Sequence, residues 1–144
     1  MSRQPPGTRA DYRAFVPMPT RWRDNDAYGH MNNAVYIELF DSALGSWQIA
    51  QGIRIHGEGA MQLVVVESGC RYHAEAGYPD VLQIGLRLAH LGRSSFKVDL
   101  AMFRNDEDTA CAEGFFSQVH MGAEGRPEPM PDLLREALTT LGDG

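Results

Sequence analysis

Cysteine and lysine are scarce in this chain of 144 residues. Its two cysteines, Cys70 and Cys111, form no CxxC pair, which excludes a disulfide framework and indicates two small buried apolar residues. Lys97 is the only lysine, and the formal net charge is −6. An acidic balance of this size does not favour a broad nucleic-acid surface, so we expect no nucleic-acid partner.

Long hydrophobic runs are also missing. No stretch approaches the ~18 consecutive apolar residues of a membrane-spanning helix, so no membrane association is expected. The polar segment 1–10 lacks the apolar run of a signal peptide, and we therefore expect a cytoplasmic protein. With 43% hydrophobic residues, the chain can bury a single core without needing disulfides or a structural metal.

The pattern along the chain predicts one domain over residues 12–144, preceded by a flexible arm over residues 1–11. A first strand is expected at 12–22, where Pro17 and Pro19 favour an edge position. Later segments alternate apolar and polar residues, which predicts four consecutive strands joined by hairpins, and a short helix follows the prolines near 130. The expected ranges of these later strands and of the helix are 63–72, 82–88, 96–102, 110–121 and 132–141.

Residues 33–51 have helical spacing. One face would be apolar, carrying Tyr36, Phe40, Ala43, Trp47 and Ala50. The opposite face would carry Glu38, Asp41, Ser42, Gly45 and Gln48. Asn32 is a suitable N-cap. One amphipathic helix with a largely antiparallel sheet predicts the α+β class, with a long central helix wrapped by five antiparallel strands, as in the hotdog architecture.

The start of this helix carries the most informative motif. Asp24 and Asp26 precede a Gly29-His30 turn, and the helix opens directly after it. A carboxylate beside unpaired helix N–H groups suits acyl chemistry, because those groups stabilise an oxyanion. Asp26 could attack a carbonyl, deprotonate a water or merely stabilise the helix start. Asp24 is interpreted as structural, and His30 could orient Asp26, contact substrate or fix the turn.

Residues 21–36, RWRDNDAYGHMNNAVY, resemble the signature of hotdog proteins similar to 4-hydroxybenzoyl-CoA thioesterase. YPD at 78–80 and GRSSF at 92–96 add weaker support. The resemblance implies an acyl-CoA thioesterase, assembled as a homodimer or as a homotetramer (a dimer of dimers). Its active site would lie between two subunits, and its substrate tunnel would run beside the long helix.

The resemblance also implies roles for single residues. Asp26 matches the family's catalytic aspartate, and Asn33 matches the helix-start residue whose N–H faces the thioester carbonyl. We expect His30 to join them, with Asn32 and Tyr36 contacting substrate. Residues of the second motif match the region that contacts the nucleotide arm of CoA: Arg93, Ser94 and Ser95.

Two alternative functions remain open at this stage. A non-catalytic acyl-CoA-binding hotdog module would keep the tunnel without turnover, and a hotdog dehydratase or hydratase would act on acyl thioesters differently. Asp24, Asp26 and His30 have the chemistry of metal ligands, but their spacing matches no strong ligand pattern, so we expect neither metal nor cofactor. His30, Asn32 and Asn33 stand where hydroxybenzoyl-specific enzymes carry apolar and aromatic residues, which argues against an aryl substrate.

Overall fold

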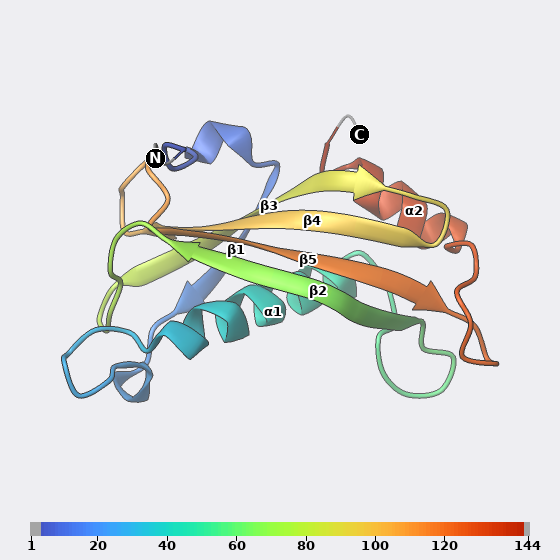
Figure 1. Cartoon of the computed structure of the whole chain (residues 1–144), viewed down its shortest axis with the longest axis horizontal. Helices are drawn as coiled ribbons and strands as arrows, with labels where there is room; N and C mark the ends of the chain where they lie inside the picture. The colour runs from blue at the N-terminus through green and yellow to red at the C-terminus, as the bar shows by residue number, and fades with distance from the viewer. Residues whose placement is uncertain (1–3, 143–144) are drawn as a thin grey trace.

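A computed structural model describes residues 4–142, which form a curved sheet around one long helix (Figure 1). The helices are α1 (Asn33–Ala50) and α2 (Asp132–Thr139), and two 3-10 turns are η1 (Arg9–Asp11) and η2 (Trp22–Asp24). The strands are β1 (Ala14–Pro19), β2 (Gln62–Tyr72), β3 (Val81–Leu91), β4 (Ser95–Arg104) and β5 (Ala112–Met121). The predicted α+β class and the helix wrapped by five antiparallel strands are confirmed.

The order of the strands corrects one expectation. The sheet runs β1-β3-β4-β5-β2, so β2 pairs with β5 and not with β3. The link between β2 and β3, residues 73–80, is therefore no hairpin, because it passes from one edge of the sheet to β3, next to the other edge. This crossing matters for function, since the link passes the start of α1: the Ala76 N–H donates to the Tyr36 hydroxyl at 2.9 Å.

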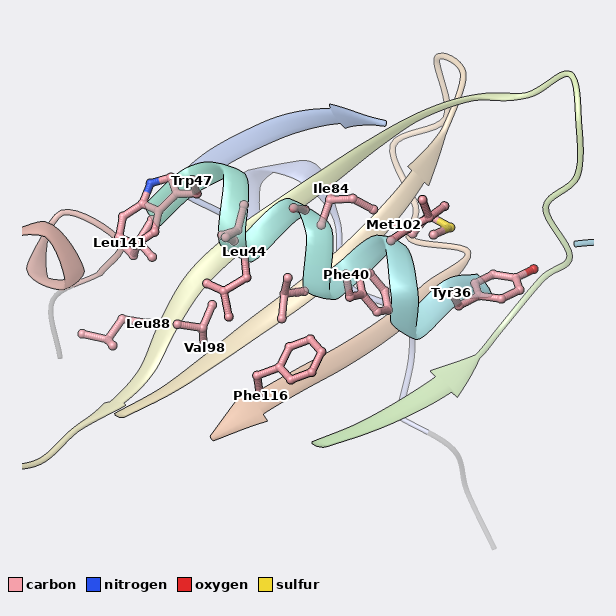
Figure 2. Packing of buried hydrophobic residues seen from close by; sticks show 14 of the residues in the cluster. Tyr36, Phe40, Leu44, Trp47, Ile84, Leu88, Val98, Met102, Phe116 and Leu141 are labelled. Carbon is pink, nitrogen blue, oxygen red and sulfur yellow. The ribbon is translucent and has the colours of Figure 1, made fainter. Parts of the chain in front are cut away.

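The helix α1 begins as predicted. The Asn32 side chain accepts from the Ala34 N–H at 2.9 Å, which satisfies one of the free donors at the helix start. Tyr36, Phe40, Leu44 and Trp47 then point along one side of the helix into the core (Figure 2). The helix is buried by the inner face of the sheet, and α2 closes the far end, where Leu141 lies beside Trp47 (Figure 2).

The predicted division of α1 into two faces is partly wrong. Gln48, expected on the polar face, is only 3% exposed, and Gly45 is half-buried, whereas Ala50 at the helix end is exposed. The reason is the curvature of the sheet, which covers the helix over more than one narrow stripe. A buried glutamine therefore lies inside the core, at a position where the sequence pattern predicted solvent.

The described part of the N-terminal segment makes backbone hydrogen bonds to the segment between β4 and β5. The expected arm over residues 1–11 includes residues 1–3, which lie outside the described residues. From there on, Ala110 N–H donates to Gly7 O at 2.9 Å and Arg9 N–H to Asp108 O at 3.2 Å. The first strand is shorter than the predicted 12–22 but lies at an edge of the sheet, as its prolines indicated.

Membrane spanning by a helix is not supported in residues 4–142. No helix of that range combines the length and the apolar character needed to cross a bilayer.

The contact between α1 and the sheet predicts the effect of one methyl group. A Cβ added at Gly114 would lie 2.9 Å from the Gly69 carbonyl oxygen and 3.0 Å from the buried Phe40 ring. Gly114→Ala should lower the free energy of unfolding in urea by about 1–3 kcal/mol, because the packed interior cannot move aside. Gly45→Ala is the control: its Cβ would meet Ile55 at 3.8 Å, so a higher helix propensity should leave stability equal or raised. Equal losses in both variants would contradict this account.

Candidate active site

The loop before α1 is anchored by a buried carboxylate. Asp24, 1% exposed, accepts from the Arg21 backbone N–H at 2.8 Å and from Arg21 Nη2 at 2.8 Å. Its carbonyl oxygen accepts from the Asn32 N–H at 2.9 Å. The prediction that Asp24 is structural agrees with these contacts, since the side chain is enclosed and paired. Arg21 also reaches Glu38 on α1 at 3.3 Å, so the loop is tied to the helix that it introduces.

Asp26 lies in a tight turn that leaves one of its oxygens free. Its N–H donates to His30 O at 2.8 Å, and its Oδ1 accepts from the Tyr28 N–H at 2.8 Å and from the His30 N–H at 3.4 Å. Gly29 makes the turn possible with a φ of 83°, a conformation that costs glycine nothing. Within residues 4–142, Oδ2 accepts no hydrogen bond. The carboxylate is thus oriented by backbone donors and keeps one oxygen available.

Asn33 begins α1 and presents a free donor. As the first helical residue it has no carbonyl four residues earlier within the helix, and no acceptor in the loop or among the side chains of residues 4–142 takes its N–H. Its carbonyl oxygen accepts from the Tyr72 hydroxyl at 3.1 Å. Within the described part of the chain, the helix start therefore offers an N–H without an acceptor, together with the positive end of the helix dipole.

Two tyrosines form the wall opposite the loop. The rings of Tyr36 and Tyr72 meet edge to face with centroids 5.0 Å apart. Burial raises the pKa of Tyr36 and raises the pKa of Tyr72 to about 12. Both hydroxyls therefore stay neutral near pH 7. Tyr72 consequently acts as a hydrogen-bond donor to the helix start and Tyr36 as an acceptor, and neither acts as a base.

These groups line one pocket of about 460 Å³ at the start of α1. Asp26, His30, Asn33 and Tyr36 all contribute to it, so the structure brings together four of the eight site residues predicted from the sequence. Asn32, also predicted, is not among the lining residues, because its side chain caps the helix.

Glu75 is a site residue that the sequence did not reveal. It follows β2, lines the pocket, and places Oε2 2.9 Å from His30 Nε2. The two residues are 45 positions apart in the sequence and no local pattern links them. They meet only because the 73–80 link crosses the start of α1.

Arg93, Ser94 and Ser95 lie at the other end of the molecule. Arg93 and Ser94 lie in the turn between β3 and β4, and Ser95 begins β4. The Ser94 carbonyl accepts from the His120 N–H at 2.7 Å, and the Arg93 carbonyl accepts from Arg135 Nη2 at 3.1 Å. The loop before α1 and this turn are at opposite ends of the sheet (Figure 1). A single chain therefore does not bring these three residues to the pocket that holds Asp26.

The thiols are poor candidates for chemistry. Cys111 is buried, and burial raises its pKa to about 12; burial also raises the pKa of Cys70. Both groups are therefore protonated near neutral pH, and a protonated thiol is a weak nucleophile. Among residues 4–142 no three side chains of the histidine, cysteine, aspartate and glutamate types cluster in a way that could hold a metal ion.

Comparison with known proteins places the chain in a family. Residues 20–138 match the model of the thioesterase-like superfamily. The structure is similar to that of the PA5185 protein of Pseudomonas aeruginosa, with 41% identity, a TM-score of 0.90, and 95% of this chain and 96% of that chain covered. A thioesterase from Thermus thermophilus, solved in complex with coenzyme A and Zn, is 29% identical with a TM-score of 0.71 over 89% of this chain and 92% of that one.

Among curated proteins, the 1,4-dihydroxy-2-naphthoyl-CoA hydrolase of Synechococcus elongatus is 26% identical over 85% of this chain and 93% of its own length. The family model spans the loop, α1 and strands β2 to β5, and so includes every residue that lines the pocket. The chain therefore belongs to the thioesterase-like superfamily.

Proposed function

We propose that this protein is an acyl-CoA thioesterase that hydrolyses its substrate to a free acid and CoA, with Asp26 as nucleophile or general base. One observation carries the proposal: the same pocket is lined by a carboxylate oxygen and a helix-start N–H that have no hydrogen-bond partner within residues 4–142. The names of the relatives, a CoA hydrolase and a thioesterase with bound coenzyme A, support the same substrate class.

Asp26 has two routes to the same products. As a nucleophile, its free oxygen bonds to the thioester carbon, the C–S bond breaks with its electron pair on sulfur, and water then hydrolyses the mixed anhydride. As a general base, it takes a proton from the water that attacks the same carbon. In both routes the thiolate leaves and gains a proton to become CoA. The orientation of Asp26 by the Tyr28 N–H serves either route.

The carbonyl oxygen of the thioester would face the N–H of Asn33. As that oxygen gains negative charge, the N–H and a partial charge of roughly +0.5 at the helix start stabilise it. His30, held at Nε2 by Glu75, keeps Nδ1 for a hydrogen bond or a proton transfer near the reacting carbon. Tyr36 forms the wall behind the acyl group.

A second copy of the chain would complete the site. β2 is an edge strand, and Val64, Val65 and Val66 along it are exposed, Val66 by 61%. Such an edge pairs readily with another copy of itself in an antiparallel way. That pairing sets the start of one β2 against the end of the other, and so moves the Arg93 turn of one subunit toward the Asp26 pocket of its partner. Arg93, Ser94 and Ser95 would then bind the nucleotide arm of CoA.

Two free thiols fit a reducing compartment, so a cytoplasmic location belongs to the same proposal. A binding module without turnover is the second candidate. The pocket alone would suit it, but it would not need the free carboxylate oxygen of Asp26. A dimer of dimers is compatible with the same β2 pairing.

Asp26→Asn tests the chemistry. We expect release of free CoA, followed with a thiol reagent over short, medium, long and aryl acyl-CoAs, to fall by about 10²- to 10⁴-fold, because the amide neither attacks nor accepts a proton. Asp106→Asn, on an exposed turn, is the matched control and should keep wild-type activity. Circular dichroism confirms that both variants fold. Binding of acyl-CoA without turnover in the wild type would favour the binding module.

Val66→Lys tests whether two copies of the chain pair through β2. A lysine on each copy of the paired edge would bring like charges together, so we expect sedimentation to show more monomer and CoA release to fall with it. Val81→Lys, on an exposed residue of β3 away from that edge, should leave both unchanged. A Val66→Lys protein that stays a dimer at low micromolar concentration would refute pairing through β2.

A further inference from the structure

A second hollow lies farther along α1, on the flank that faces β2. Its volume is about 350 Å³, and apolar walls come from Leu44, Ile55, Met61 and Leu63. Gly45 opens the helix side of the hollow, since it has no side chain to fill it. We call this hollow the α1 groove.

Two buried glutamines form the polar part of the α1 groove. Gln48 on α1 is 3% exposed and Gln118 on β5 is 6% exposed, and Gln48 Nε2 donates to Gln118 Oε1 at 3.1 Å. They meet 70 positions apart in the sequence, in a core that is otherwise built of apolar side chains.

This pair leaves hydrogen-bonding capacity unused. Gln48 Oε1 and Gln118 Nε2 make no hydrogen bond with any group in residues 4–142. Within residues 4–142, Arg104 Nε is the one side-chain nitrogen or oxygen that is fully enclosed and has no hydrogen-bond partner. Gln48 Oε1 and Gln118 Nε2 therefore each keep some contact with solvent. The groove is the opening that both side chains line, so one acceptor and one donor face into it.

Buried amides with spare capacity need a reason, since two apolar residues of similar size would pack the same space without the cost of desolvation. Apolar walls with a few convergent polar groups are what small-molecule sites provide. The charge near the groove further limits which ligands could bind there. Asp41 is the charged residue among those that line it, so a carboxylate would be repelled and a neutral oxygen accepted.

We propose that the α1 groove is an acyl subsite that selects acyl groups carrying a neutral hydrogen-bonding oxygen, a hydroxyl or a ketone, over plain hydrocarbon chains. Gln118 Nε2 donates to that oxygen, and Gln48 Oε1 accepts from it when it is a hydroxyl. This inference rests on the proposed thioesterase function, because it assumes that the acyl group enters from the Asp26 pocket.

The distance between the groove and the Asp26 pocket determines how far along the acyl chain the selected oxygen must lie. Asn33, Ile37, Asp41, Gly45 and Gln48 recur at steps of four and three and so lie on one stripe of α1. The helix rises about 22 Å from Asn33 to Gln48, and the Gln48 side chain leans back toward the helix start. For a chain that enters from the Asp26 pocket of the same subunit, an extended advance of about 1.2 Å per bond places the selected oxygen roughly 12 to 16 carbons from the thioester. Entry from the partner's pocket, which the proposed β2 pairing would bring toward the groove, would shift the preference to shorter chains.

The test compares matched acyl-CoAs of eight to eighteen carbons, each as the plain chain, the ω-hydroxy chain and the ω-carboxy chain. For wild type we expect kcat/KM to favour the hydroxy member over the plain one by about tenfold near the predicted depth, and not at eight carbons. The ω-carboxy members should be the poorest substrates. The double variant Gln48→Leu/Gln118→Leu should lose the hydroxy preference, while Gln51→Leu, on an exposed residue at the end of α1, should keep it.

Gly45→Leu serves as a second variant if the double variant does not fold. A leucine there would fill the groove and leave both glutamines in the sequence, so the longest hydroxyacyl-CoAs should lose turnover while eight-carbon substrates keep theirs. A wild type that hydrolyses the plain and hydroxy members equally at every length would overturn the inference, and so would a preference that survives in the double variant. A double variant that changes only dimer dissociation would show that a second copy fills the groove.

Failure of the proposed thioesterase function can be distinguished from failure of the proposed subsite. If wild type hydrolyses no acyl-CoA at all, calorimetric binding of the same matched pairs still tests the groove. A hydroxy preference in binding that disappears in the double variant would support the subsite. Equal affinities of the plain and hydroxy members would refute it.

Discussion

The burial of α1 by the inner face of the sheet is the contact that organises the whole domain. Phe40 lies fully buried against Gly114, where no side chain larger than hydrogen fits between helix and strand. Because the sheet curves around the helix, its two ends differ. α2 packs over the end near Trp47, and the end at Asn33 remains open. The helix start thus keeps its free N–H beside a pocket, although the helix itself lies in the core.

Several separate parts of the chain hold the open end in place. The Asp24 carboxylate binds Arg21 on one side of the loop, and Asn25 Oδ1 accepts from the Tyr78 N–H at 2.9 Å on the other. Tyr36 accepts from the link after β2 in the same way. Each contact satisfies a polar group that would otherwise be costly to bury. Together they orient Asp26 with backbone donors and need no further side chain to do so.

The part of the candidate site that lies ahead of α1 could be predicted from the sequence because it is local. The N-cap Asn32, the Gly29 turn and the placement of Asp26 ahead of α1 lie within eight residues, and their geometry follows from turn and helix rules. The strands could be found from alternation, although their pairing could not. Glu75 could not be predicted, because its contact with His30 depends on where the 73–80 link passes the start of α1. The alternation of apolar and polar residues does not encode that path.

Periodic and local features could be read from the order of residues alone: a long capped helix, five strands, and a carboxylate set before a helix start. Three others needed the folded chain, namely the pairing of β2 with β5, the meeting of Gln48 and Gln118 inside the core, and the distance of the Arg93 turn from Asp26. The physical reason is range. Helix spacing, caps and turns depend on neighbours a few residues away, whereas strand pairing and burial depend on how distant segments share one core.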